Sequence, residues 1–253
     1  MELPVNQIIC GDCLEVMKDL PEKSIDLILT DLPYGVTQNR EDIKLPLDLL
    51  WGQWKRLLKP DTGTVILTSQ FPYTIDLILS NRSWFKYDLI WNKILVSGFL
   101  NANKMPLRVH EHILIFYEKT ARYFPQKVAG QKSHSRGTKL RVARRNYGEH
   151  KEVDNSERDG YFKHPTSIIS IPKPHSSVAL HPTEKPVELA EYLVKTYLLE
   201  NDCVLDPCIG VGWTAIACRK LKRYFIGIDI SSKYVEIAQK RLATIPEKLT
   251  AFI

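Results

Sequence analysis

The sequence predicts an α/β protein with a mixed, mostly parallel sheet covered by helices on both faces. Short apolar segments of strand length alternate along the chain with longer segments whose apolar residues recur at helical spacing. This alternation is typical of parallel-rich sheets, because a crossover helix joins one strand to the next. The 253 residues, 44% hydrophobic and 25% charged, suffice for one large core, or for a core with a small insert.

Eight segments have the length and composition of strands, and six have the apolar periodicity of helices. The expected strands are residues 7–10, 24–30, 63–68, 87–91, 112–117, 166–170, 202–205 and 224–228. The expected helices are residues 13–20, 47–58, 72–81, 186–199, 213–221 and 231–242. Pro186 suits the first position of its helix, and Ser231 is a good N-cap for the last one.

Composition and charge narrow the function classes only a little. The longest apolar runs have strand length and fall short of the roughly 20 residues of a membrane span. The net charge of +6 is a weak indication of a nucleic-acid partner. Five cysteines, an odd number, and no visible secretory signal at residues 1–4 predict reduced thiols in a cytoplasmic protein. Cys10 and Cys13 lack a second close pair that would complete a metal site.

The alternation of strands and helices breaks between residues 119 and 164. Apolar periodicity fades there, and residues 127–145 contain seven lysines and arginines but no acid. We expect an insert or long loop at 119–164, between two halves at 1–118 and 165–253. Its charge would suit the phosphates of a nucleic acid, whereas a solvated basic loop is the alternative interpretation.

A glycine-containing turn at residues 206–212 joins a buried strand to a helix. Gly210 and Gly212 allow a tight turn and close approach of a ligand. Asp229, at the end of the next strand, is placed to hold ribose hydroxyls. The pattern also fits a loose dinucleotide fingerprint. A nicotinamide enzyme is disfavoured because Asp206 suits a cationic ligand better than a pyrophosphate, and because the turn lies close to the C-terminus.

Two further segments could belong to a ligand site. Lys185 lies just before a helix, where it could hold a carboxylate together with the helix N-terminus, although an ordinary proline-capped loop is the favoured interpretation of this segment taken alone. Asp12 and Cys13 follow the first strand. Asp12 could accept from an adenine amino group or could merely cap the next helix.

The segment Asp31-Leu32-Pro33-Tyr34 directly follows an apolar strand. The exocyclic amine of a base is a poor nucleophile, because its lone pair is delocalised into the ring. Asp31 and the backbone carbonyl of Leu32 could accept its two N–H groups and orient the nitrogen. Tyr34 could stack on a base swung out of a duplex, with Pro33 fixing the backbone. An ordinary structural turn is the alternative interpretation.

Three segments together resemble amino-directed DNA methyltransferases. Asp31-Leu32-Pro33-Tyr34 resembles their Asp-Pro-Pro-Tyr motif, and residues 206–212 resemble their Asp-Pro-Phe-x-Gly-x-Gly cofactor motif. Residues 181–186 are similar to the His-Pro-Thr-x-Lys-Pro segment before it. The order of catalytic motif, basic region and cofactor motif is that of the β class. Residues 101–106 and 110–112 also resemble a bacterial and phage subgroup.

The resemblance implies a Rossmann-like fold with circularly permuted motifs and one antiparallel strand. It implies S-adenosylmethionine as cofactor and DNA as substrate, with a homodimer as a further expectation. Residues 1–118 would be the catalytic half, 119–164 a target-recognition insert and 165–253 the cofactor half. Members with Asp at position 31 usually methylate adenine N6. Cytosine-N4 or RNA amino methylation, and a non-catalytic DNA-binding relic, are the alternatives.

The expected site residues fall into two groups. The catalytic residues are Asp31, Leu32, Pro33 and Tyr34. The cofactor-binding residues are Asp12, Cys13, Thr183, Lys185, Asp206, Pro207, Cys208, Gly210, Gly212, Asp229 and Ile230. The resemblance assigns Asp12 and Asp229 to the adenosine, and Asp206, Thr183 and Lys185 to the methionine region. The chain departs from the family at Leu32, Cys208, Val211 and Trp213, of which Trp213 is expected to narrow the pocket or weaken affinity.

Overall fold

An eight-stranded sheet forms the centre of the computed structural model, which describes residues 2–35, 43–130, 161–175, 177, 180 and 184–246. Across the sheet the strands are β1 (Gln7–Cys10), β10 (Tyr224–Asp229), β9 (Cys203–Asp206), β2 (Leu27–Thr30), β3 (Thr64–Ser69), β5 (Arg108–Tyr117), β4 (Phe85–Ser97) and β8 (Ile168–Ser170). β5 runs antiparallel to both neighbours, whereas the other pairings are parallel. The expected mixed sheet with one antiparallel strand is confirmed.

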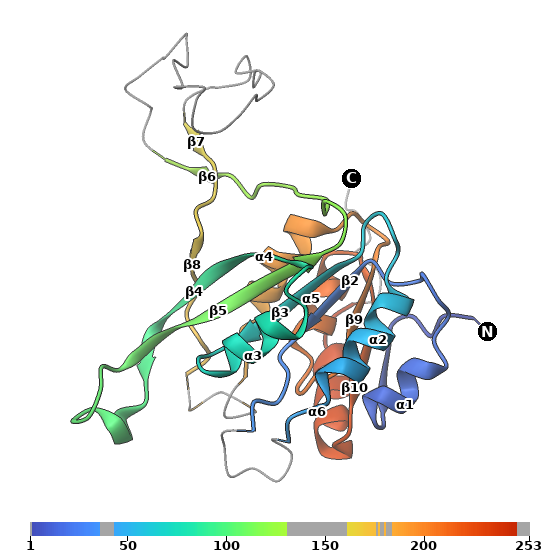
Figure 1. The fold of residues 1–253 in the computed structure, drawn as a ribbon, viewed down its shortest axis with the longest axis horizontal. Coiled ribbons are helices and arrows are strands. Elements are labelled where there is room, and N and C mark those ends of the chain that lie inside the picture. The colour runs from blue at the N-terminus through green and yellow to red at the C-terminus, as the bar shows by residue number, and fades with distance from the viewer. Residues whose placement is uncertain are drawn as a thin grey trace. The chain divides into compact units, whose positions relative to one another are not determined.

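Helices cover both faces of the sheet, as Figure 1 shows. They are α1 (Cys13–Lys18), α2 (Leu47–Leu57), α3 (Tyr73–Ser80), α4 (Val187–Tyr197), α5 (Trp213–Lys220) and α6 (Ser232–Ala243). Side chains of α1, α2 and α3 belong to one buried apolar cluster, and those of α4, α5 and α6 to another. Along β2, Leu27 and Leu29 face one cluster and Ile28 the other, because successive side chains of a strand point to opposite faces.

The first residues of α1, α6 and α4 test the helix capping that the sequence predicts. Asp12 caps α1, since its carboxylate accepts from the backbone N–H of Leu14 at 2.8 Å. Ser231 occupies the N-cap of α6, but its hydroxyl makes no capping bond; its N–H instead donates to the Asp229 carboxylate at 2.9 Å. Pro186 lies at the N-cap of α4, one position earlier than expected. None of the helices among the described residues is long and apolar enough to cross a membrane.

The β4–β5 hairpin is longer than the sequence predicts. β4 and β5 continue beyond the expected 87–91 and 112–117 and project from the sheet, with the short helix η1 (Phe99–Asn101) at the tip (Figure 1). Beyond Asn92 and His110 the strands pair with each other at Ser97 and Arg108, and Ile94, Leu95 and Val96 are exposed, so burial does not mark this outer part in the sequence. Phe99 and Leu100 are exposed there.

Residues 125–166 form a second unit, which begins and ends a few residues later than the expected insert at 119–164. Within it, β6 (Val128–Ala129) pairs antiparallel with β7 (Phe162–Lys163). Most of the basic segment at 127–145, from residue 131 onward, lies outside the described residues.

Candidate active site

Four acidic residues gather at one edge of the sheet. β1, β10, β9 and β2 are parallel neighbours, so their carboxyl ends lie together. Asp12 follows β1, Asp229 ends β10, Asp206 ends β9 and Asp31 follows β2. Ligands of open parallel sheets bind at this edge. The fold therefore brings the expected catalytic segment beside the expected cofactor turn, although about 175 residues separate them in the sequence.

The two glycines of the cofactor turn serve different purposes. Gly210 has φ 53°, and a Cβ placed there would meet no atom within 4 Å, so the backbone faces open space. Gly212 has φ 91°, and its Cβ would lie 3.0 Å from the Cβ of Ala238. Gly212 thus permits close packing of the turn against α6. Gly210 leaves room where a ligand would approach.

Asp206 and Asp229 hold the turn in shape. The Asp206 carboxylate, 1% exposed, accepts from the Thr214 hydroxyl at 2.7 Å and the Cys208 N–H at 3.1 Å. Burial raises the pKa of Asp206 to about 7. Asp229 accepts from the Gly210 N–H at 2.8 Å as well as from Ser231. A bound cation would favour the ionised form of Asp206.

The remaining expected cofactor residues line the same edge, with one exception. Pro207 is buried and Ile230 is 68% exposed at the end of β10. A hydrogen bond from Cys208 lowers the pKa of Cys13 and raises that of Cys208. Thr183 lies outside the described residues. Carboxylates at three strand ends and the open space at Gly210 fit a ligand with ribose hydroxyls and a cationic centre, as S-adenosylmethionine has.

The catalytic segment is held by its own contacts and by β3. The Tyr34 hydroxyl donates to Asp31 Oδ1 at 2.8 Å, and the Thr68 hydroxyl donates to the same oxygen. The Tyr34 ring lies 5.4 Å from that of Tyr73, tilted by 42°. Burial, together with the charges of Asp31 and Glu111, raises the pKa of Tyr34 well above its ordinary value, so its hydroxyl keeps its proton. Leu32 is buried, and Pro33 is partly buried.

Lys185, expected at the methionine end of the cofactor, lies against the catalytic segment. Its ammonium is 2.6 Å from Asp31 Oδ2 and 3.3 Å from Glu111 Oε2. The Lys93 ammonium lies 3.2 Å from the other Glu111 oxygen. Burial disfavours the charge of Lys185, but the carboxylates of Asp31 and Glu111 outweigh it and raise its pKa. Two lysines and two acids thus form a nearly buried ion cluster.

Sequence reasoning missed Glu111, Lys93 and Thr68. Glu111 and Lys93 each stand within an apolar strand segment and are 5% and 3% exposed. Charged side chains are almost never so buried unless they are paired. The sequence records this signal only indirectly, because Lys93 and Glu111 lie just outside the strands expected at 87–91 and 112–117. The partners of each charge lie on other segments and could not be identified without the fold.

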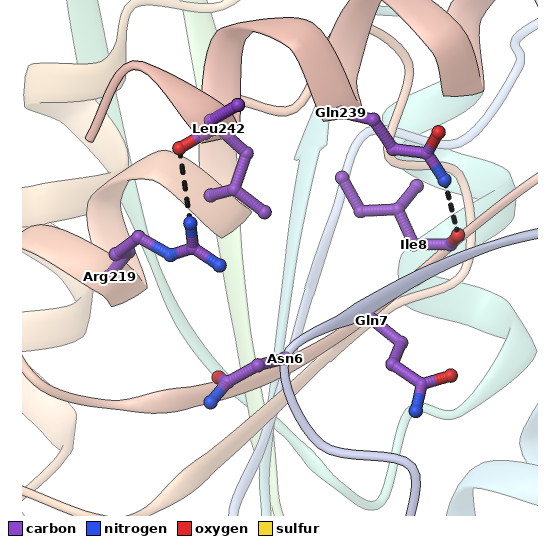
Figure 2. A pocket seen from close by; sticks show the side chains of 7 residues that line it. Asn6, Gln7, Ile8, Arg219, Gln239 and Leu242 are labelled. Atoms are coloured by element: carbon purple, nitrogen blue, oxygen red, sulfur yellow. Dashed lines mark hydrogen bonds between the residues drawn. The ribbon is translucent and has the colours of Figure 1, made fainter. Parts of the chain in front are cut away.

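A surface hollow lies near the start of β1, at the opposite end of that strand from Asp12 (Figure 2). Its lining includes Arg219 and Gln239, which are already engaged with the fold. Arg219 donates to the carbonyl of Leu242 at 3.1 Å, and Gln239 donates to that of Ile8 at 3.2 Å. The hollow is separate from the acidic edge.

Comparison with known proteins decides the family. The family model described as DNA methylase, of the N6/N4 group, matches residues 25–240. This chain belongs to that family. Type II methyltransferase M.BglII of Bacillus subtilis is 31% identical over 277 residues, which cover 98% of this chain and 72% of the relative. DNA adenine methyltransferase YhdJ of Escherichia coli (strain K12) is 26% identical over 253 residues, covering 93% and 82%.

A solved structure supports the fold of this DNA methylase. The crystal structure of the M1.HpyAVI–SAM complex aligns with a TM-score of 0.63 at 25% identity, covering 93% of this chain and 99% of that one. The matched range of the family model contains both the catalytic segment and the glycine turn. This DNA methylase is thus an amino-directed enzyme of Rossmann-like fold, as the motif order indicated.

Proposed function

We propose that this DNA methylase transfers the methyl group of S-adenosylmethionine to N6 of adenine in DNA, with Asp31 and Tyr34 at the reacting amine. The observation that carries the proposal is the position of Asp31. Its carboxylate follows β2, directly beside β9, whose glycine turn leaves open space for a ligand. An acceptor for the amine and a site for the methyl donor therefore lie side by side.

The residues at this edge can orient the amine without acting as a strong base. Bound S-adenosylmethionine supplies an electrophilic methyl group. Asp31 and the Leu32 carbonyl accept the two N–H groups, which aims the nitrogen lone pair at that methyl. The negative Asp31 carboxylate also stabilises the positive charge that develops on nitrogen. The proton can leave late, because the amine becomes acidic only once methylated.

The Tyr34 ring is the proposed platform for a base swung out of the duplex. It lies beside Asp31, so a base stacked on it would present its amine to the carboxylate. The proposal of adenine over cytosine rests on the aspartate at position 31 and on the similarity to a relative named as an adenine methyltransferase. The family itself includes both N6 and N4 targets.

Long-read sequencing of DNA from cells expressing the protein tests the reaction, since it reports the modified base with its context. Nucleoside analysis of the same DNA should show N6-methyladenine and no N4-methylcytosine. Asp31→Ala should lower the rate of methyl transfer on the order of a hundredfold or more, with S-adenosylmethionine affinity by calorimetry nearly unchanged. N4-methylcytosine would refute the base choice, and an active Asp31→Ala variant would refute the catalytic site.

A further inference from the structure

Asp31 belongs to a cluster of two carboxylates and two ammonium groups. Lys185 bridges Asp31 and Glu111 at 2.6 and 3.3 Å, and Lys93 approaches Glu111 at 3.2 Å. Gln70 also donates to Glu111 at 2.9 Å. The side chains of Lys93, Lys185 and Glu111 are between 4% and 7% exposed, so water screens these charges little.

We propose that Glu111 is a positioning residue for methyl transfer, which draws part of the Lys185 charge away from Asp31. This inference rests on the proposed role of Asp31. Lys185 fixes Asp31 Oδ2 while the Tyr34 and Thr68 hydroxyls fix Oδ1, so the carboxylate is held on both oxygens. Without Glu111, Lys185 would neutralise Asp31 alone and weaken its attraction for the amine.

Burial of such a cluster costs free energy, which makes a purely stabilising role a weak explanation for it. Glu111 keeps its charge because Lys185 and Lys93 outweigh the effect of burial and lower its pKa. In Lys93, burial prevails over the attraction of Glu111 and lowers the pKa. The cluster therefore places an ionised Glu111 next to the Lys185 ammonium, which in turn contacts Asp31, the proposed acceptor of the reacting amine.

The pH dependence of the reaction separates this role from a structural one. The titratable and charged groups facing the cluster from the described elements are Asp31 and Tyr34 after β2, Lys93 on β4, Arg108 and Glu111 on β5, Lys173 after β8, Lys185 before α4 and Asp206 on β9. The acidic limb of the rate profile reports proton uptake by the carboxylates among them.

Glu111→Gln and Lys185→Met should shift the acidic limb of the rate profile in opposite directions. Glu111→Gln keeps the shape but removes one negative charge, so the remaining carboxylate beside Lys185 should resist protonation and the limb should move down by about one pH unit. Lys185→Met removes the bridging cation, so the two carboxylates should take up protons more easily and the limb should move up by a similar amount.

The test is single-turnover methyl transfer at saturating S-adenosylmethionine, measured from pH 3.5 to 9 so that the acidic limb lies inside the range. The substrate is an oligonucleotide that carries the recognition sequence found by sequencing. At its pH optimum Glu111→Gln should be slowed about tenfold, less than for loss of a direct contact. Affinity for S-adenosylmethionine should not change.

Asp26→Asn is a matched control. Asp26 is a buried acid, 1% exposed and 2.7 Å from the Lys59 ammonium, just before β2 at the opposite end of that strand. Its loss should lower the melting temperature and leave the pH limb in place. Coincident limbs in the parent and Glu111→Gln would overturn the inference, provided that Asp31→Asn is inactive. An active Asp31→Asn would overturn the proposed function itself.

Discussion

At the residue scale, Tyr34 combines a ring that can stack with a hydroxyl that already has a partner. The ring packs against Tyr73, and the hydroxyl donates to Asp31 at 2.8 Å. The sequence motif accounts for the ring alone, whereas the structure adds a hydrogen bond that orients the proposed catalytic carboxylate. These two contributions can be separated by substitution.

Tyr34→Phe should keep appreciable activity, because stacking needs only the ring. The lost bond to a charged acceptor should still slow single-turnover methyl transfer, by roughly tenfold. Tyr34→Ala, which also removes the ring, should be impaired about a hundredfold or more. Equal rates for the Phe and Ala variants would argue against stacking on Tyr34.

Asp206 should make the ligand-free protein less stable as pH rises. Burial raises its pKa from 3.8 to about 7, so between these values the folded protein binds a proton that the unfolded chain has lost. The stabilisation is complete below about pH 4 and is lost as pH rises toward 7, with a total on the order of a few kcal/mol.

Asp206→Asn removes this titration while conserving shape. The melting temperature of the variant relative to the parent should therefore increase from pH 5 to pH 7 and level off above it, as measured by thermal melts without cofactor. The variant loses an acceptor for Thr214 at every pH, so only the change with pH is diagnostic. A constant difference would show that the carboxylate stays ionised.

At the element scale, the turn between β9 and α5 depends on backbone conformations rather than on side-chain contacts. Gly210 and Gly212 both have positive φ, and only Gly210 faces open space. The strand before the turn and the helix after it are set by local sequence. Whether the space beside Gly210 belongs to a ligand site depends on Asp12 after β1 and Asp229 at the end of β10, which only the fold brings to the same edge of the sheet.

Gly210→Val should abolish S-adenosylmethionine binding while the fold survives. A side chain would occupy the open space, and the left-handed backbone would cost about 1–2 kcal/mol. Gly98→Val is the matched control, because Gly98 also has positive φ (90°) with no atom within 4 Å of its Cβ, but lies in the β4–β5 hairpin. Both should melt at similarly lowered temperatures, and only Gly98→Val should bind the cofactor in calorimetry.

At the scale of the whole molecule, the basic segment at 127–145 remains a prediction of the sequence. Replacing Arg141, Arg144 and Arg145 by Gln should weaken DNA binding and make its dependence on salt less steep, because fewer counterions are released. Cofactor binding should persist. A control with the same change of charge replaces Lys18, Lys220 and Lys240, which lie at the C-terminal ends of α1, α5 and α6. The prediction fails if the two triple variants have the same salt slope.

Much of the fold could be predicted because its signals are local. Strands such as 7–10 match the structure, since a short apolar run bounded by turn residues needs no partner to be recognised. The hairpin and the Ser231 cap could not be predicted in full. The outer part of the hairpin is held by strand pairing, and Asp229 provides the bond that positions the Ser231 backbone.

The sequence by itself determined the class of fold, the order of the motifs and the family, because apolar periodicity, turn chemistry and short motifs are properties of neighbouring residues. Tertiary structure alone decided which charges meet. Asp31, Glu111, Lys93 and Lys185 come from distant segments, and only the sheet order brings them within 2.6 to 3.3 Å of one another along the cluster. Their interaction depends on distance and burial in three dimensions, which no local pattern records.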